Sequence, residues 1–572
     1  MARRSLPAAA VLAFIFLVAA AAQTPQRPST LRVNTQLVEV SVVVKDSQGN
    51  PVPGLKQDDF ELYDRDKRQE IKIFQAEDYR QGAVAPTPPP PLMLAAPHTY
   101  SNRVQIEPGA LNPPTVVVID AGSTWDTNRM TWQDLVYARD QLVQFLRQVR
   151  PEDRLGFYLM GPHQFWILRE YNQSCADLLE RLATWKTPAE APAASKAADA
   201  WAEFAIHFLG TDPETAKAIH RAQFWYTTAT AVGPIPPEWR DGFLVAPSLS
   251  LLEAVASHLA SVPGRKNVIL ISGTMFLPKE FKDQVASLRN IIQAGVTVYA
   301  IDPGGLAPYD LDASFVIPSK VTASVPSGQE SRAAQAYVQK GEDSKRQTML
   351  ALHSSLTEIA ESTGGKAFLD TNDIKGAVRG AFDDSRVSYT LGFYAADLRN
   401  DGSYHPLKVK LPGRENLAVH CRDGYFEPES PQREVQRRDT ELRQAVWSPA
   451  DATGIQLSGT LSPAAGPNDY DLQVYIGLAG LNLLQDGDLW NGQLDVTLFA
   501  RDNSGNAWHS VSDTLRLNLR EGGLDMWLRT GYPYSRNVRL IPQATALRVI
   551  VRDANSRNLG SLTIPVPGAP GL

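Results

Sequence analysis

Cysteine is nearly absent from this chain, which has only Cys175 and Cys421 in 572 residues. A metal site made of cysteines alone needs more thiols than that, so one is excluded. The two cysteines fall far apart, in segments predicted to form different elements. We therefore expect two independent thiols, while a disulfide is the alternative that an oxidising compartment would allow.

Net charge is also small, at −6 for the whole length. A nucleic-acid-binding surface or an anionic-membrane surface normally shows a clear basic excess. The sequence therefore gives no reason to expect nucleic acid as a partner. Because a single core rarely serves a chain this long, several domains are expected.

The motifs of common enzyme classes are missing as well. No glycine-rich dinucleotide fingerprint follows the first apolar strand, and no phosphate-binding loop or nucleophile elbow is present. The nine histidines are scattered, and the spacing of His207 and His220 does not match a two-histidine metal motif. We therefore predict that the chain is not an enzyme.

One long apolar run stands at the N-terminus. Arg3 and Arg4 precede the run from Ala8 to Ala22, which ends in small residues before Gln23. This is the pattern of a signal peptide over residues 1–22, with an uncleaved anchor helix as the alternative. It predicts export to the periplasm, the cell surface or the medium. We expect no transmembrane segment after cleavage.

The first folded part is predicted to be all-β. Residues 31–80 contain a strand at Val38–Val44, a turn cluster, and two short alternating runs, which are typical of a small sandwich-like module. Residues 81–112 include Pro88–Pro91 and are expected to form an extended linker.

Residues 113–427 show a different pattern, in which apolar strands alternate with helical segments. Such alternation predicts a mostly parallel sheet with helices on both faces. Two stretches interrupt it, at about 187–241 and 304–344, and are predicted to be insertions. Alternating runs near the end predict a terminal β-hairpin. The predicted sheet strands are residues 116–119, 155–160, 165–168, 268–271, 296–301 and 367–369.

The remainder is predicted to be a charged linker over residues 428–446 and a C-terminal β-sandwich over residues 447–572. Its predicted strands lie between Gly, Asn and Asp turns. They are residues 455–461, 471–476, 493–500, 513–518 and 547–551.

Several segments together resemble a known family, the von Willebrand factor type A (VWA)-related proteins abundant in Acidobacteria. The likeness covers roughly residues 31–427 and implies an α/β fold class, a VWA-like, Rossmann-type doubly wound sheet, here flanked by the N-terminal β-module and the C-terminal sandwich. It also implies export, but little about the ligand. The segments are Leu37–Phe60, Thr115–Asp120, Lys266–Ser272, Gly295–Asp302, Ile359–Phe368 and Tyr389–Tyr425.

The resemblance also implies a candidate divalent-cation site for Mg²⁺ or a similar ion. Asp120 matches the first ligand of the adhesion-site pattern, and Thr124 can stand for its last serine, but Gly122 replaces the middle serine. Ser272 stands where an aspartate is usual. The site is therefore expected to be degenerate, with no certain cofactor, and the alternative is that Asp120 caps the following segment or hydrogen-bonds the loop. Further candidates to contact a partner at this rim are Ser123, Ser248, Ser250 and Ser272.

The predicted function is interaction with a protein partner, in adhesion or assembly. The aromatic residues between Trp201 and Trp239 either help to form the partner surface or pack the insertion onto the core. One alternative is a structural component of the envelope without a discrete ligand. Another is a carboxylate-dependent hydrolase, which would need a second converging acid or base.

Overall fold

In a computed structural model, about two thirds of the residues of the chain are described. They are 36–80, 98–103, 114–120, 132–149, 153–160, 165–171, 176–184, 247–262, 265–305 apart from 274, 276 and 278–281, 330–427 apart from 396, 397 and 400, scattered positions between 438 and 450, and 451–568 apart from 503–506.

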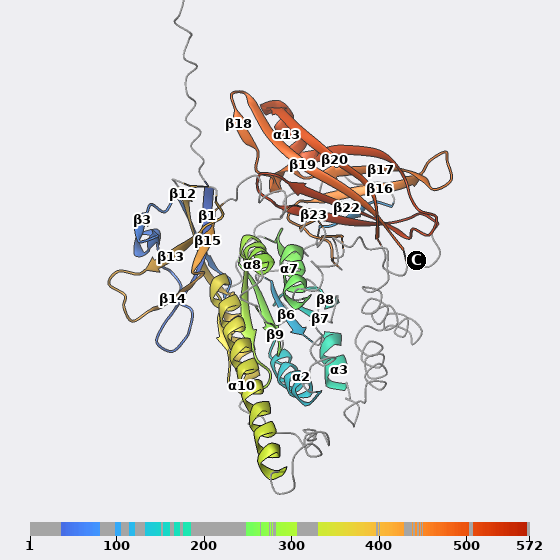
Figure 1. Cartoon of the computed structure of the whole chain (residues 1–572). Coiled ribbons are helices and arrows are strands. Elements are labelled where there is room, and N and C mark those ends of the chain that lie inside the picture. Colours follow the sequence, from blue (N-terminus) through green and yellow to red (C-terminus); the bar gives the residue numbers. More distant parts are fainter. Residues whose placement is uncertain are drawn as a thin grey trace, which may run out of the picture.

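A six-stranded sheet, here called the central sheet, lies in the middle of the molecule (Figure 1). Its strand order is β11-β10-β9-β6-β7-β8, and every neighbouring pair is parallel except β7 with β8. The strands formed where the apolar runs predicted them. They are β6 (Thr115–Asp120), β7 (Leu155–Met160), β8 (Phe165–Arg169), β9 (Lys266–Ile271), β10 (Val296–Ile301) and β11 (Ala367–Phe368).

Helices cover both faces of the central sheet. Because side chains alternate along a strand, Val117 and Ile119 of β6 pack on one face while Val116 and Val118 pack on the other. The first face is covered by α2 (Trp132–Leu146), α3 (Ala176–Thr184) and α11 (Ile374–Asp383). The second is covered by α7 (Pro247–Leu259), α8 (Lys282–Gln293) and α10 (Glu330–Thr363).

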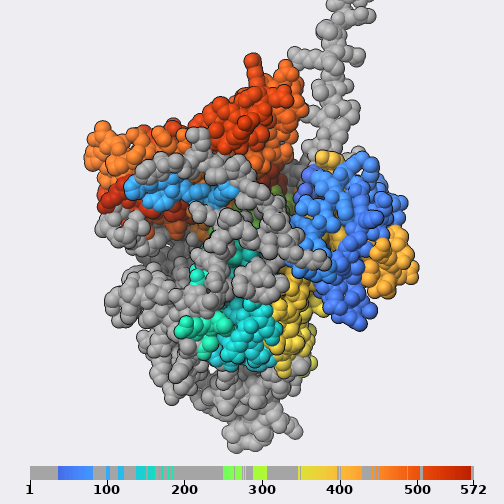
Figure 2. Space-filling model, turned by 180° about the vertical axis from the view of Figure 1, so that it is seen from behind, coloured from blue at the N-terminus to red at the C-terminus, as the bar shows by residue number. Residues whose placement is uncertain are grey.

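A two-sheet unit, here called the first sandwich, combines strands from distant parts of the chain. One sheet has the order β14-β1-β12-β4 and the other β15-β13-β2-β3. Figure 2 shows the N-terminal segment (blue) packed with later residues (orange) in this unit. The strands are β1 (Gln36–Lys45), β2 (Glu61–Asp64), β3 (Lys67–Gln69), β4 (Ile73–Asp78), β12 (Val387–Ala395), β13 (Tyr404–Lys410), β14 (Ala418–Cys421) and β15 (Gly424–Phe426).

A second sandwich follows at the C-terminal end. Its sheets are β21-β17-β16-β5 and β18-β19-β22-β23, with β20 paired to β19 and the helix α13 (Glu521–Thr530) following β20. The short strand β5 (Tyr100–Ser101) joins it from the predicted linker, against β16 (Figure 2). The other strands are β16 (Leu457–Pro463), β17 (Asp469–Ile476), β18 (Leu484–Asp486), β19 (Leu489–Arg501), β20 (Ala507–Arg520), β21 (Tyr532–Arg539), β22 (Ala546–Asp553) and β23 (Leu559–Pro565).

Both sandwiches contact the central sheet at its amino edge, where the parallel strands begin. Arg265, just before β9, donates from Nη1 to Ser41 Oγ of the first sandwich at 3.0 Å. On the other side, the backbone N–H of Thr453 donates to the Ser257 carbonyl near the C-terminal end of α7, at 3.0 Å. Helices that precede parallel strands end at the amino edge, so this contact lies there too.

Two glycines let α10 end tightly and the chain enter β11. Gly364 adopts φ +82°, in the left-handed region that favours glycine, and a Cβ there would lie 2.6 Å from the backbone nitrogen of Arg422. A Cβ on Gly365 would lie 1.9 Å from the Val298 carbonyl oxygen. Larger residues at either position would push the chain away from the first sandwich or from β10.

The expected fold class, an α/β VWA-like doubly wound sheet with flanking β-modules, is wrong for the chain. The described residues are mostly β, and four of their five sheets are antiparallel. The apolar periodicity located the strands of the central sheet correctly, but periodicity does not reveal how distant strands pair. Those pairings make antiparallel structure dominant.

Two further expectations concern insertions. The segment expected to be irregular at 304–344 is helical from Glu330 onward, because α10 begins there.

The aromatic segment at 187–241 and the predicted signal peptide at 1–22 lie outside the described residues. In the part of the chain that is described, no helix is both long and apolar enough to cross a membrane.

Candidate functional site

Asp120 and Ser272 form a buried pair at the carboxyl edge of the central sheet. Asp120 is the last residue of β6, and Ser272 directly follows the neighbouring strand β9. Both are 0% exposed. The Ser272 hydroxyl donates to Asp120 Oδ2 at 2.7 Å and accepts from the backbone N–H of Met275 at 3.1 Å. The serine thus holds both the carboxylate and the loop after β9.

A second polar group lies at the end of the next strand. Asp302 follows β10, and its Oδ2 lies 2.9 Å from His353 Nε2 of α10. Its Oδ1 accepts from the backbone N–H of Gly304 at 2.9 Å, which holds the turn that directly follows the strand. The other ring nitrogen of His353 lies 4.0 Å from Oδ2 of Asp370. The imidazole therefore lies between a buried carboxylate and an exposed one.

Asp370 differs from the other acidic residues at this edge in its exposure. Its side chain is 66% exposed, whereas that of Asp302 is 7% exposed. Its backbone has φ 50°, a left-handed conformation that aspartate tolerates better than most residues. Because it follows β11, the outermost strand, it places a hydrated carboxylate at the rim beside His353.

The two groups lie at the ends of adjacent strands, since β10, β9 and β6 are consecutive in the sheet. Their edge is opposite to the amino edge, where both sandwiches dock. Figure 1 shows α10 extending away from the sandwiches on this side. Open parallel sheets commonly bind ligands at the carboxyl ends of their strands.

The other predicted site residues are placed only in part. Thr124 and Ser123 lie outside the described residues. Ser248 and Ser250 belong to the first turn of α7, and the side chain of Ser250 is half-buried, whereas that of Ser248 is not described. Of the predicted set, the structure thus brings Asp120 and Ser272 together and places Ser248 and Ser250 on α7.

Sequence reasoning missed His353 and Asp370. Asp370 carried a usable signal, because it follows the predicted strand at 367–369 and strand ends gather at one edge. His353 carried none, because nothing in a helical segment tells which strand end a side chain will reach.

The described residues offer a poor set of ligands for Mg²⁺, which prefers several oxygen ligands. Asp120 supplies one carboxylate and Ser272 one hydroxyl, and these two already hydrogen-bond each other. Within the described part of the chain, no group of three or more His, Cys, Asp or Glu is placed to hold a metal ion. The edge, as far as it is described, is better suited to hydrogen bonding than to metal coordination.

Comparisons with known proteins give no family. No protein-family model matches the chain, and no curated protein matches it. Among solved structures, the human COPII-coat protein Sec24c shares 8% identity with a TM-score of 0.20, covering 59% of this chain and 45% of that one. The pilus adhesin SpaC from Lactobacillus rhamnosus GG shares 10% identity with a TM-score of 0.19, covering 84% and 57%.

The chain thus spans about half the length of these two structures. At such TM-scores, neither likeness carries an argument about fold or function. The class that the structure itself defines is a protein of two antiparallel sandwiches attached to one edge of a central sheet, with a polar opposite edge. The resemblance to VWA-related proteins stays a prediction from sequence.

Proposed function

We propose that this chain is an exported protein that binds a protein partner, in adhesion or assembly, through the carboxyl edge of its central sheet. The observation that carries the proposal is the placement of that edge. Both sandwiches dock at the amino edge, so neither covers Asp302, His353 and Asp370 at the other end.

The chemistry of the edge supports recognition. The buried carboxylates of Asp120 and Asp302 hydrogen-bond neighbouring groups, which fixes their orientation before a partner arrives. Asp370 then presents an exposed carboxylate next to an oriented imidazole. A partner with a basic or hydrogen-bond-donating group at the matching position would gain a charge-assisted bond there.

One observation favours a second candidate function, a hydrolase. The contact between Asp302 and His353 at 2.9 Å could orient a general base. A hydrolase also needs a nucleophile or a bound water within reach of that base. Measurable ester or peptide hydrolysis that His353→Gln abolishes would favour this function over binding alone.

Affinity capture from a bacterial envelope extract tests the proposal. The purified chain is the bait, and Asp370→Asn is compared with Glu415→Gln, which changes an exposed carboxylate on the turn between β13 and β14. We expect a specific protein to be retained and Asp370→Asn to weaken its binding by about tenfold, the loss typical of one charged hydrogen bond. Glu415→Gln should leave binding unchanged.

The same material tests export and metal dependence. The mature protein should begin at Gln23 on N-terminal sequencing.

Capture should persist in EDTA, because the proposed edge uses hydrogen bonds. Loss of the partner on chelation would restore the metal hypothesis for Asp120. Equal capture by Asp370→Asn and the unchanged chain would overturn the assignment of the edge.

A further inference from the structure

The junction between the central sheet and the second sandwich depends on a short segment at residues 450–453. Thr453 donates its backbone N–H to the Ser257 carbonyl and its hydroxyl to the His258 carbonyl, at 3.0 and 2.8 Å. The backbone N–H of Ser261 donates to Thr453 Oγ1 at 3.0 Å. This segment therefore fastens the end of α7 to the sandwich.

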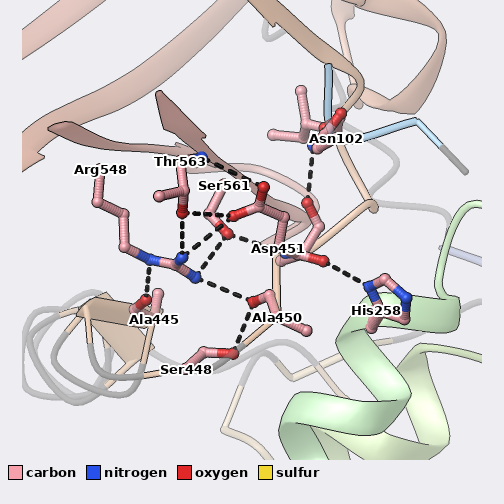
Figure 3. A network of polar contacts seen from close by, with 11 residues as sticks. Asn102, His258, Ala445, Ser448, Ala450, Asp451, Arg548, Ser561 and Thr563 are labelled. Carbon is pink, nitrogen blue, oxygen red and sulfur yellow. Dashed lines mark hydrogen bonds and ion pairs between the residues drawn. The ribbon is translucent and has the colours of Figure 1, made fainter. Parts of the chain in front are cut away.

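The sandwich side of the junction is anchored by Arg548, which is 1% exposed (Figure 3). Its guanidinium donates to the carbonyl oxygens of Ala445 and Ala450 and to Asp451 Oδ1, at 2.7, 3.0 and 3.1 Å. Burial lowers the pKa of this guanidinium to about 10, so it remains charged near neutrality. Asp451 is thereby held rigidly with its carbonyl facing α7.

His258 completes the junction through both ring nitrogens. Nδ1 lies 2.9 Å from the carbonyl oxygen of Asp451, and Nε2 lies 3.1 Å from Oε1 of Glu170. A carbonyl oxygen only accepts, so Nδ1 must carry a proton. An ionised carboxylate also only accepts, so Nε2 must carry one too. The geometry therefore corresponds to the doubly protonated, charged imidazolium.

We propose that His258 is a proton-dependent latch, which joins the second sandwich to the central sheet when charged and loosens this junction when it loses a proton. A neutral ring can donate from one nitrogen only. It must then give up either the Asp451 carbonyl or Glu170. The first choice removes the bond from His258 to the sandwich and leaves the Thr453 bonds across the junction, and the second removes the bond from His258 to Glu170.

The groups that face His258 agree with this arrangement. On the side of the central sheet, Tyr158 of β7 donates to Glu170 Oε2 at 2.9 Å, and Tyr171 is the next residue in the chain. On the side of the sandwich, Asp451 faces His258 and bonds to Arg548. Burial lowers the pKa of His258, but the hydrogen bonds and charges of Glu170 and Asp451 outweigh it, so the net pKa is raised. Burial raises the pKa of Glu170, but the bonds from His258 and Tyr158 outweigh it, so the net pKa is lowered.

These directions set the pH window. Because the folded pKa of His258 is raised, its contribution is complete below the unfolded value of 6.5 and is lost as pH rises through the folded pKa. Because that of Glu170 is lowered, its contribution is complete above 4.5 and is lost as pH falls through the folded pKa. The junction should therefore be tightest at mildly acidic pH and should loosen in alkali.

Hydrogen exchange of the full chain, followed by mass spectrometry, tests the latch. The reporters are the amides of Ser261 and Thr453, which both bond across the junction. Exchange is measured from about pH 5.5 to about pH 9 and divided by the intrinsic chemical rate. Across this range, the protection factor of the two amides should fall as pH rises. The total fall should be about tenfold for each unit by which the pKa of His258 in the folded chain exceeds its unfolded value.

Two variants and one control make the test specific. His258→Gln should remove the pH dependence, and so should Glu170→Gln, which keeps the ring but removes its counter-charge. The second variant decides the question if the first does not fold. His509→Gln changes an exposed histidine of β20 and should behave like the unchanged chain. Protection that does not vary with pH in the unchanged chain would overturn the latch. So would protection that varies with pH as much in both variants as in the unchanged chain.

Discussion

At the scale of single residues, the buried polar groups hold strand ends and loops in place. Ser272 is a clear case, because its hydroxyl both donates to Asp120 and accepts from Met275. Each hydrogen bond adds little net stability, but losing a bond to a buried charge costs more, because the charge has also lost its water. The carboxyl edge thus depends on small side chains that are placed accurately.

Ser272→Ala should therefore destabilise the carboxyl edge. It removes one donor to a fully buried carboxylate, so we expect a loss of about 1–3 kcal/mol in local stability. Hydrogen exchange of amides in β6 and β9 measures it. Ser462→Ala, at an exposed serine of β16, is the control and should stay within about 0.5 kcal/mol of the unchanged chain. An equal effect of the two substitutions would contradict the structural role of Ser272.

At the scale of elements, the first sandwich depends on one histidine held between two carboxylates. His405 of β13 lies 3.0 Å from Asp64 Oδ1 of β2 through Nδ1, and its Nε2 contacts Glu427 Oε1. Tyr425 of β15 also donates to Asp64, at 2.8 Å. The cluster is buried and joins the N-terminal strands to strands that come more than 300 residues later.

His405→Gln should destabilise the first sandwich strongly. The shorter reach of an amide does not allow it to bond to both carboxylates as the imidazole does, and breaking a buried pair by removing one partner typically costs about 3–5 kcal/mol. Hydrogen exchange of the β2 and β13 amides reports on it, because these strands pair directly. The loss should be confined to this unit, and the second sandwich should serve as the unchanged reference. A cost below about 1 kcal/mol would show that the cluster is not needed for stability.

At the scale of the whole molecule, the amino edge of the central sheet carries a buried positive charge that lies close to carboxylates of the first sandwich. Lys266 begins β9, is 6% exposed and donates from Nζ to the Val262 carbonyl at 3.0 Å. Burial lowers the pKa of this lysine to about 8, although the charges of Glu39 and Glu77 of the first sandwich raise it. The cation is thus partly balanced across the boundary between two units.

Lys266→Met should stabilise the protein near neutral pH by up to about 3 kcal/mol, less the lost hydrogen bond. Between the folded pKa of about 8 and the ordinary value of 10.5, the unfolded chain binds the extra proton, so this lysine makes stability rise with pH. The variant should lack that rise in thermal unfolding followed across this range. Lys408→Met, at an exposed lysine of β13, should leave it in place. An unchanged pH profile in Lys266→Met would contradict the burial of the charge.

Much of the local structure could be predicted from sequence. The run at 116–119 became β6, and the alternating residues expected near the end of 113–427 include those of β12. Burial on both faces gives a continuous apolar run, and burial on one face gives an alternating one. Strands β21 and β23 were missed. Residues 532–539 of β21 are largely polar and exposed, so they show neither an apolar run nor a clear alternation of apolar and polar residues.

The candidate site was predictable only in part. Asp120 and Ser272 could be placed together, because both follow apolar runs and strand ends meet at one edge. His353 could not, because it comes from a helix that reaches the edge from one face of the sheet. Of the metal site implied by the resemblance, Asp120 is placed beside Ser272, and Thr124 lies outside the described residues.

The sequence by itself determined where the apolar strands of the central sheet form, because periodic burial is a local property of neighbouring residues. It also determined which side chains end the parallel strands. Only the tertiary structure decided that β1 pairs with β12 and β14, that both sandwiches dock at the amino edge, and that His258 contacts Glu170 and Asp451 at once. These contacts join residues up to several hundred positions apart, and such pairings are set by the packing of whole surfaces.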